Sequence, residues 1–173
     1  MNVSNNVLVP CHSSLNQWFH DALTYDALKK RVLAGELKSL STQDSAFVLA
    51  FVAKQGWICL AVQNDDKPFV QALAEAGADL SAVDDEGNSI LVNAKTADMF
   101  RWLHEKGAKF IHANNVSMLQ FVFDHSQRLF SIETEWKNLL VEIMPSATLE
   151  DFCALDKKQL INLMGMAKDN EVI

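Results

Sequence analysis

The chain has 173 residues, 49% of them hydrophobic and 21% charged, a composition that supports a buried core and is unlike that of a disordered protein. Its 15 Lys and Arg against 22 Asp and Glu give a net charge of −7. This balance disfavours direct binding to nucleic acid, because phosphate backbones are held by clustered cations. The length predicts a single domain over residues 1–173.

The cysteines and the apolar runs predict the compartment. Cys11, Cys59 and Cys153 are an odd number at wide spacing, which favours reduced thiols. Residues 1–9 lack the basic and long apolar regions of a secretory signal, and the longest unbroken apolar run, 46–53, is too short to cross a bilayer. We therefore expect a cytoplasmic protein that has no membrane partner.

Helical spacing of apolar residues begins at Ser14 and predicts two helices that form an N-terminal hairpin and end at Gly35. Ser41 is the expected cap of a third helix. Because this helix is apolar on nearly every face, we expect it to lie between its neighbours, with Gly56 as its stop. A fourth helix is expected over residues 67–76.

Two segments about thirty residues apart have the same pattern. Residues 69–79 begin with Phe-Val-Gln-Ala-Leu and close with Gly-Ala-Asp, whereas residues 99–109 begin with Met-Phe-Arg-Trp-Leu and close with Gly-Ala-Lys. Gly77 and Gly107 are each expected to end a helix at positive φ, where a Cβ would be strained. Between them the sequence predicts a projecting loop and then a short helix capped by Ser89.

This pattern resembles the ankyrin repeat, in which an Asp and a Gly precede Thr-Pro-Leu-His and a later Gly-Ala-Asp. Here Asp84, Gly87, Ser89 and Leu91 occupy the Asp, Gly, hydroxyl and Leu positions, although Ile90 stands where Pro is usual. The resemblance covers roughly residues 56–123. Its best unit is Asp84 to Lys109, and in the next unit the Gly, hydroxyl and Leu positions hold Asn115, Ser117 and Leu119.

The C-terminal part departs from the repeat. Either Thr96 or Asp98 is expected to start the helix that ends at Lys106, and a longer amphipathic helix further on is terminated by Pro145. Thr148 and Asp156 can each cap a further helix. Four tryptophans at helical core-like positions are expected to pack in the interior: Trp18, Trp57, Trp102 and Trp136.

The resemblance implies an all-α fold, an ankyrin-like helical-hairpin solenoid with atypical capping helices. We expect an N-terminal cap hairpin over 14–40, ankyrin-like repeats over 41–125 and C-terminal cap helices over 126–173. Terminal units of such arrays cover the last apolar face.

Motifs for chemistry are missing from the sequence. It contains neither a GxGxxG nor a GxxxxGK[ST] phosphate loop, and its histidines and cysteines lack the short pairings that surround a metal. We therefore expect no enzyme activity, no cofactor and no metal. An alternative is an enzyme with an unrecognised site near Cys11, His12 and His20.

Ankyrin-type proteins usually bind partners through their loop tips and through the concave face formed by first helices. This implies partner-binding residues on two loop tips and on the short helix between them: Asp84, Asp85, Glu86, Asn88, Asn93, His112, Asn114 and Asn115.

The charge distribution indicates the kind of partner. Between residues 55 and 94 there are seven acids and one base, Lys67, so this window carries −6. Such a field favours a protein with a basic surface. An inhibitor fits these properties, for example an immunity protein that neutralises a toxin; an alternative is an effector that captures a host protein. The oligomeric state stays open.

Overall fold

The computed structural model describes residues 18, 22, 24–81, 83–128 and 133–169. These residues form nine α-helices and three short 3-10 helices, with no β-strand among them, so the all-α prediction is confirmed for this part of the chain. No single described helix is both long enough and apolar enough to cross a bilayer, and one pair of consecutive helices passes that test only when taken together.

The described residues belong to two compact units. The described residues up to 57 and residues 68–78 form the first unit, and residues 58–67 with the described residues from 79 onward form the second. The predicted boundaries at residues 40 and 125 stay a prediction.

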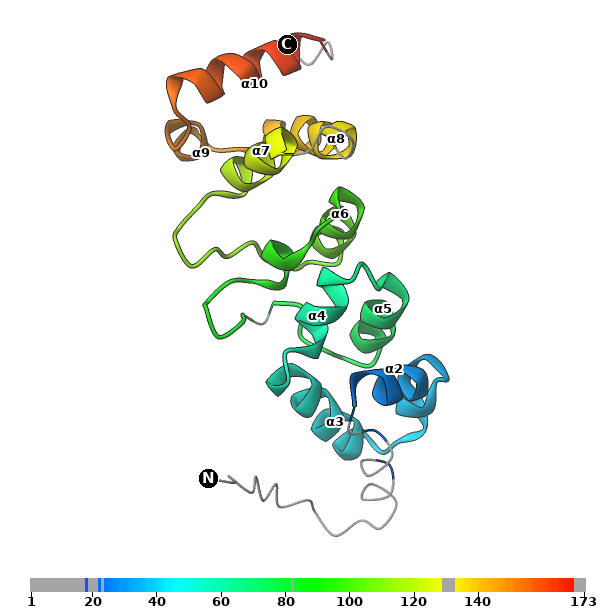
Figure 1. The fold of residues 1–173 in the computed structure, drawn as a ribbon. Coiled ribbons are helices and arrows are strands. Elements are labelled where there is room, and N and C mark those ends of the chain that lie inside the picture. Colours follow the sequence, from blue (N-terminus) through cyan, green and yellow to red (C-terminus); the bar gives the residue numbers. More distant parts are fainter. Residues whose placement is uncertain (1–17, 19–21, 23, 82, 129–132, 170–173) are drawn as a thin grey trace, which may run out of the picture. The chain divides into compact units, whose positions relative to one another are not determined.

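The first unit begins with α2 (Tyr25–Leu33) and η1 (Glu36–Ser39), followed by α3 (Thr42–Lys54) and, after a gap in sequence, most of α5 (Lys67–Glu75) (Figure 1). The Ser41 hydroxyl caps α3 by accepting a hydrogen bond from the Asp44 N–H at 3.2 Å. Gly35 and Gly56 follow α2 and α3 with positive φ. The predicted stops of both helices and the cap of α3 are therefore confirmed, whereas the helix predicted from Ser14 lies largely outside the described residues.

The third predicted helix is not enclosed on every side, contrary to our expectation. Val48 and Val52 of α3 are buried, but Ala46, Ala50 and Ala53 are exposed. Because the outward positions are alanines, their exposure costs little free energy, and hydrophobicity on all faces did not require burial on all faces.

Edge-to-face aromatic contacts hold the first unit together. The Tyr25 ring lies 5.5 Å from the Phe69 ring and 6.1 Å from the Trp57 ring, and Phe51 lies 5.4 Å from Trp57, all measured between centroids. Such pairs contribute about 0.5–1.5 kcal/mol beyond the area that they bury. Trp57 is nevertheless only half-buried.

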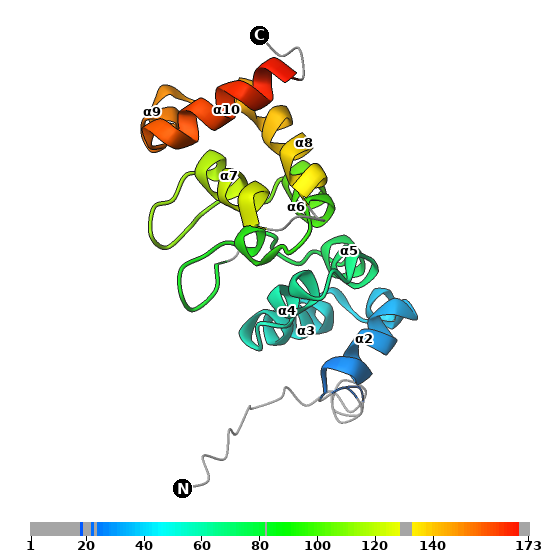
Figure 2. The same cartoon turned by 45° about the horizontal axis from the view of Figure 1, so that its top comes forward.

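The second unit contains the remaining helices (Figures 1 and 2). In chain order these are α4 (Trp57–Gln63), whose first residue belongs to the first unit, η2 (Ile90–Asn93), α6 (Ala97–Glu105), α7 (Met118–Arg128), α8 (Glu133–Ile143), η3 (Met144–Ser146), α9 (Leu149–Cys153) and α10 (Lys157–Asp169). Helices α7 and α8 pack against each other, and α6 packs against α8. Phe100 of α6 lies between these helices. Its ring centroid is 5.9 Å from that of Phe121 on α7 and 5.7 Å from that of Trp136 on α8. Trp136 is buried as expected, whereas Trp102 is half-buried.

Short polar side chains set the helix starts of the second unit. Thr96, not Asp98, caps α6 by accepting from the Met99 N–H at 3.1 Å. Thr148 caps α9, and Asp156 accepts from the N–H of Gln159 at 2.8 Å at the start of α10, both as predicted. Pro145 lies within η3, directly after the end of α8.

The two predicted glycine stops have the same local geometry. Gly77 has φ +99° and Gly107 has φ +88°. The next residue in each case donates a backbone hydrogen bond to the carbonyl five residues earlier: Ala78 to Leu73 at 2.9 Å and Ala108 to Leu103 at 3.1 Å. The prediction of left-handed helix ends at both positions is confirmed.

Candidate functional site

Two loops of the second unit carry seven of the eight predicted contact residues. The first loop (residues 83–89) precedes η2, and the second loop (residues 111–117) precedes α7. Both loops project on the same side of this unit, away from α6 (Figures 1 and 2). We call them together the loop pair.

Asp84 closes the first loop. Its Oδ1 accepts hydrogen bonds from the backbone N–H groups of Glu86 at 3.0 Å and Asn88 at 2.9 Å. Its own N–H donates to the Asn88 carbonyl at 2.8 Å, and its carbonyl accepts from the Gly87 N–H at 3.0 Å. The Asp84 side chain is therefore engaged in bonds within the turn and is not simply presented to solvent at its tip.

The second loop makes the same turn 28 residues later. The Asn115 N–H donates to the His112 carbonyl at 2.9 Å, as Gly87 does to Asp84. The Asn114 N–H donates to His112 Nδ1 at 3.2 Å, so the imidazole takes the place of the Asp84 carboxylate. Asn115 has φ +54°, in the left-handed region that Gly87 also occupies. The predicted correspondence of Gly87 and Asn115 is confirmed.

Three hydrogen bonds join the loops to each other. Asn88 Oδ1 accepts from the Ala113 N–H at 2.9 Å, and Ser89 exchanges two bonds with Ile111, one through its N–H and one through its hydroxyl. Asn88 and Ser89 are only 9% and 0% exposed. The predicted capping role of Ser89 is wrong, because its hydroxyl accepts the Ile111 N–H at 3.1 Å and makes no cap bond to η2.

A short hydrogen-bonded chain connects the first loop with α4 and η2. Gln63 Nε2 donates to Asn93 Oδ1 at 2.7 Å, and Asn93 Nδ2 makes a longer contact with Asp84 Oδ2 at 3.5 Å. Sequence reasoning missed Gln63. A partial signal was present, since Gln63 lies 30 residues before Asn93, close to the spacing at which the sequence pattern recurs.

The electrostatics of this surface keep Asp84 ionised. Partial burial by itself raises the pKa of Asp84, but hydrogen bonds from Asn88, Asn93 and Glu86 outweigh this effect and hold the pKa below its ordinary value. Burial and, to a smaller extent, the charge of Asp84 raise the pKa of the Cys59 thiol on α4. Cys59 is therefore protonated near neutral pH, which is the opposite of what a reactive cysteine requires.

The predicted residues differ in how far they reach solvent. Asp85, Glu86, Asn114 and Asn115 are exposed. Asp84, Asn93 and His112 are half-buried, and Asn88 is buried. The outward surface of the loop pair is therefore acidic on the first loop and carries neutral amides on the second.

The described part of the chain contains no cluster of three or more His, Cys, Asp and Glu side chains that could hold a metal ion. The alternative site near Cys11, His12 and His20 lies outside the described residues.

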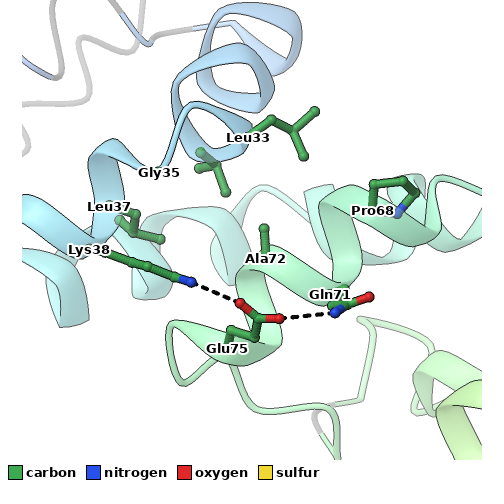
Figure 3. A pocket seen from close by; sticks show the side chains of 9 residues that line it. Leu33, Gly35, Leu37, Lys38, Pro68, Gln71, Ala72 and Glu75 are labelled. Atoms are coloured by element: carbon green, nitrogen blue, oxygen red, sulfur yellow. Dashed lines mark hydrogen bonds and ion pairs between the residues drawn. The ribbon is translucent and has the colours of Figure 1, made fainter.

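A separate groove of about 270 Å³ lies in the first unit (Figure 3). Its polar end is formed by Lys38 and Glu75, which pair at 2.9 Å, and by Gln71, which donates to the other Glu75 oxygen at 3.0 Å. The rest of its lining is mainly apolar, with Leu33 exposed at the rim. It contains none of the predicted site residues.

Comparison with models of protein families, with curated proteins and with solved structures finds no match to this chain. The ankyrin resemblance therefore rests on the sequence pattern alone and stays a prediction.

Proposed function

We propose that this chain is a non-enzymatic protein–protein interaction module of ankyrin-like helical hairpins, whose loop pair binds and inhibits a basic partner protein. An immunity protein that neutralises a toxin is one example of such an inhibitor. The observation that carries the proposal is the loop pair itself, two turns of the same construction joined by three hydrogen bonds.

Contacts at repeat spacing support the ankyrin-like organisation within the second unit. Thr96 donates to Asp65 at 2.8 Å, and Lys67 pairs with Asp98 at 2.8 Å. Each contact joins residues 31 positions apart, close to the spacing of about thirty residues at which the sequence pattern recurs. Side chains of one proposed repeat thus contact the following repeat, as expected where each repeat packs on its neighbour.

Preorganisation makes the loop pair suitable for binding. Ordering a flexible loop on association costs free energy, and a loop already held in shape avoids that cost. The bonds made by Asp84, Asn88 and Ser89 hold the backbone of the first loop, while Asp85 and Glu86 extend into solvent. These exposed acids favour a partner that presents Lys or Arg, and they speed its approach.

Charge reversal of the exposed acids tests the proposal. The partner is first isolated by pull-down from the native host and identified by mass spectrometry. The double variant Asp85→Lys with Glu86→Lys should then slow association by about tenfold or more at low salt, and the difference should shrink as salt increases.

A matched double variant controls for net charge. Glu105→Lys with Glu135→Lys makes the same change of charge at exposed positions on α6 and α8. Its association rate should change much less than that of the loop variant. Equal rates for the two variants, or an unchanged rate for the loop variant, contradict binding through the acidic loop.

A further inference from the structure

We propose that His112 makes the loop pair respond to pH: the neutral imidazole holds the second loop in its turn, and the imidazolium releases it. This regulation rests on the binding function proposed above, because the loop that changes belongs to the same surface.

The geometry of the turn requires a neutral imidazole. The Asn114 backbone N–H can only donate, so His112 Nδ1, 3.2 Å away, must offer a lone pair. The proton of the neutral ring is then on Nε2. In the imidazolium both ring nitrogens carry protons, and the Asn114 hydrogen bond is lost.

The first loop lacks this sensitivity. Its equivalent acceptor is the Asp84 carboxylate, which keeps its lone pairs throughout the range in which histidine normally titrates, between about pH 5 and about pH 8. The first loop also has the bond from the Asp84 N–H to the Asn88 carbonyl. No corresponding bond joins the His112 N–H to the Val116 carbonyl within the described residues, so the second turn depends more on its side-chain acceptor.

No ion pair within the described residues fixes the charge of His112. Its ring lies 6.3 Å from the Phe121 ring of α7. The Ser117 hydroxyl of the second loop reaches Asp151 of α9. The titratable and charged residues of the first loop, α7 and α9 are Asp84, Asp85, Glu86, Asp124, His125, Arg128, Glu150, Asp151 and Cys153.

Protonation changes the surface in two ways. It frees the Asn114 N–H, which loosens the second loop, and it adds a positive charge next to a loop with three acids. Both changes oppose a basic partner, since one removes preorganisation and the other reduces the attractive field.

The Asn114 amide reports the turn directly. In the ¹⁵N-labelled full chain, its protection from hydrogen exchange, corrected for the intrinsic pH dependence, should fall about fivefold between about pH 7.5 and about pH 5.5, the factor expected for one hydrogen bond. In His112→Asn, protection should be constant, because an amide oxygen accepts in the same kind of turn at every pH. His112→Asp, which keeps an acceptor in this range, should behave in the same way.

A basic probe separates the pH response from the proposed binding function. A lysine decapeptide should bind the wild type several-fold more weakly at about pH 5.5 than at about pH 7.5. It should bind His112→Asn with the same affinity at the two pH values, once any change in the charge of the peptide itself is corrected for. Constant Asn114 protection in the wild type, or an equal fall in His112→Asn, overturns the pH response whatever the peptide does. If the protection of the Asn114 amide depends on pH but the peptide binds at neither pH, the pH response stands and the binding function is contradicted.

Discussion

The first and second loops make the same turn with different residues. One uses a carboxylate and a glycine, and the other uses an imidazole and an asparagine. Even so, both loops have the backbone bond from the fourth residue to the first and a positive φ at the fourth residue. The turn therefore requires two properties and not a fixed sequence: an acceptor at its first position and a residue that tolerates positive φ at its fourth. Charge is free to differ, which is why only the first loop offers an acidic surface.

The largest test of this equivalence concerns the leucines that follow the loops. Leu91 and Leu119 are 0% and 2% exposed and lie 28 residues apart. Leu91→Ala and Leu119→Ala should each lower the free energy of unfolding by about 2–5 kcal/mol, because each leaves a cavity in the core. Chemical denaturation measures both values. A loss below about 1 kcal/mol at either position contradicts the repeat register.

A smaller test exchanges the residues that tolerate positive φ. Gly87→Ala should lower the free energy of unfolding by about 1 kcal/mol through backbone strain alone, since the added Cβ would meet Ala113 at an ordinary 3.9 Å. Asn115→Gly removes the side chain from a left-handed position and should stay within about 0.5 kcal/mol of the wild type. Thermal unfolding of the two variants side by side gives the comparison. Equal losses of stability in the two variants would mean that Gly87 and Asn115, the fourth residues of the two turns, are not equivalent.

The smallest effect concerns the acceptor of the first loop. Because the pKa of Asp84 is lowered on folding, its ionised form contributes stability above the unfolded value of 3.8, and this contribution is lost as the pH falls through the lower folded value. Asp84→Asn should therefore be less stable than the wild type near neutral pH. The difference should shrink in acid, as followed by denaturation from about pH 7 to about pH 2. A difference that grows on acidification gives the wrong sign for this carboxylate.

The predicted contact residues illustrate how far sequence reasoning reached. It placed Asp85, Glu86, Asn114 and Asn115 on loop surfaces, and these side chains are exposed. It treated Asn88 in the same way, although the Asn88 oxygen is occupied by the Ala113 N–H. A turn pattern identifies polar residues in a loop, but it does not distinguish those that face solvent from those that bond a neighbouring loop.

The short helix after the first loop shows the same limit. The expected helix is only the 3-10 turn η2, and Ser89 bonds Ile111 instead of capping it. The preference of serine for helix starts is a local property. The backbone N–H of Ile111, 22 residues away in the second loop, donates to the Ser89 hydroxyl oxygen instead.

The sequence by itself determined where most of the described helices begin and end, because caps such as Ser41 and left-handed glycines such as Gly77 act through bonds to residues three to five positions away. Only the tertiary structure decided which loop side chains are available to a partner. Asn88, Ser89 and Asn93 each bond a residue from another segment, and such bonds depend on how the segments lie in space, which no local pattern specifies.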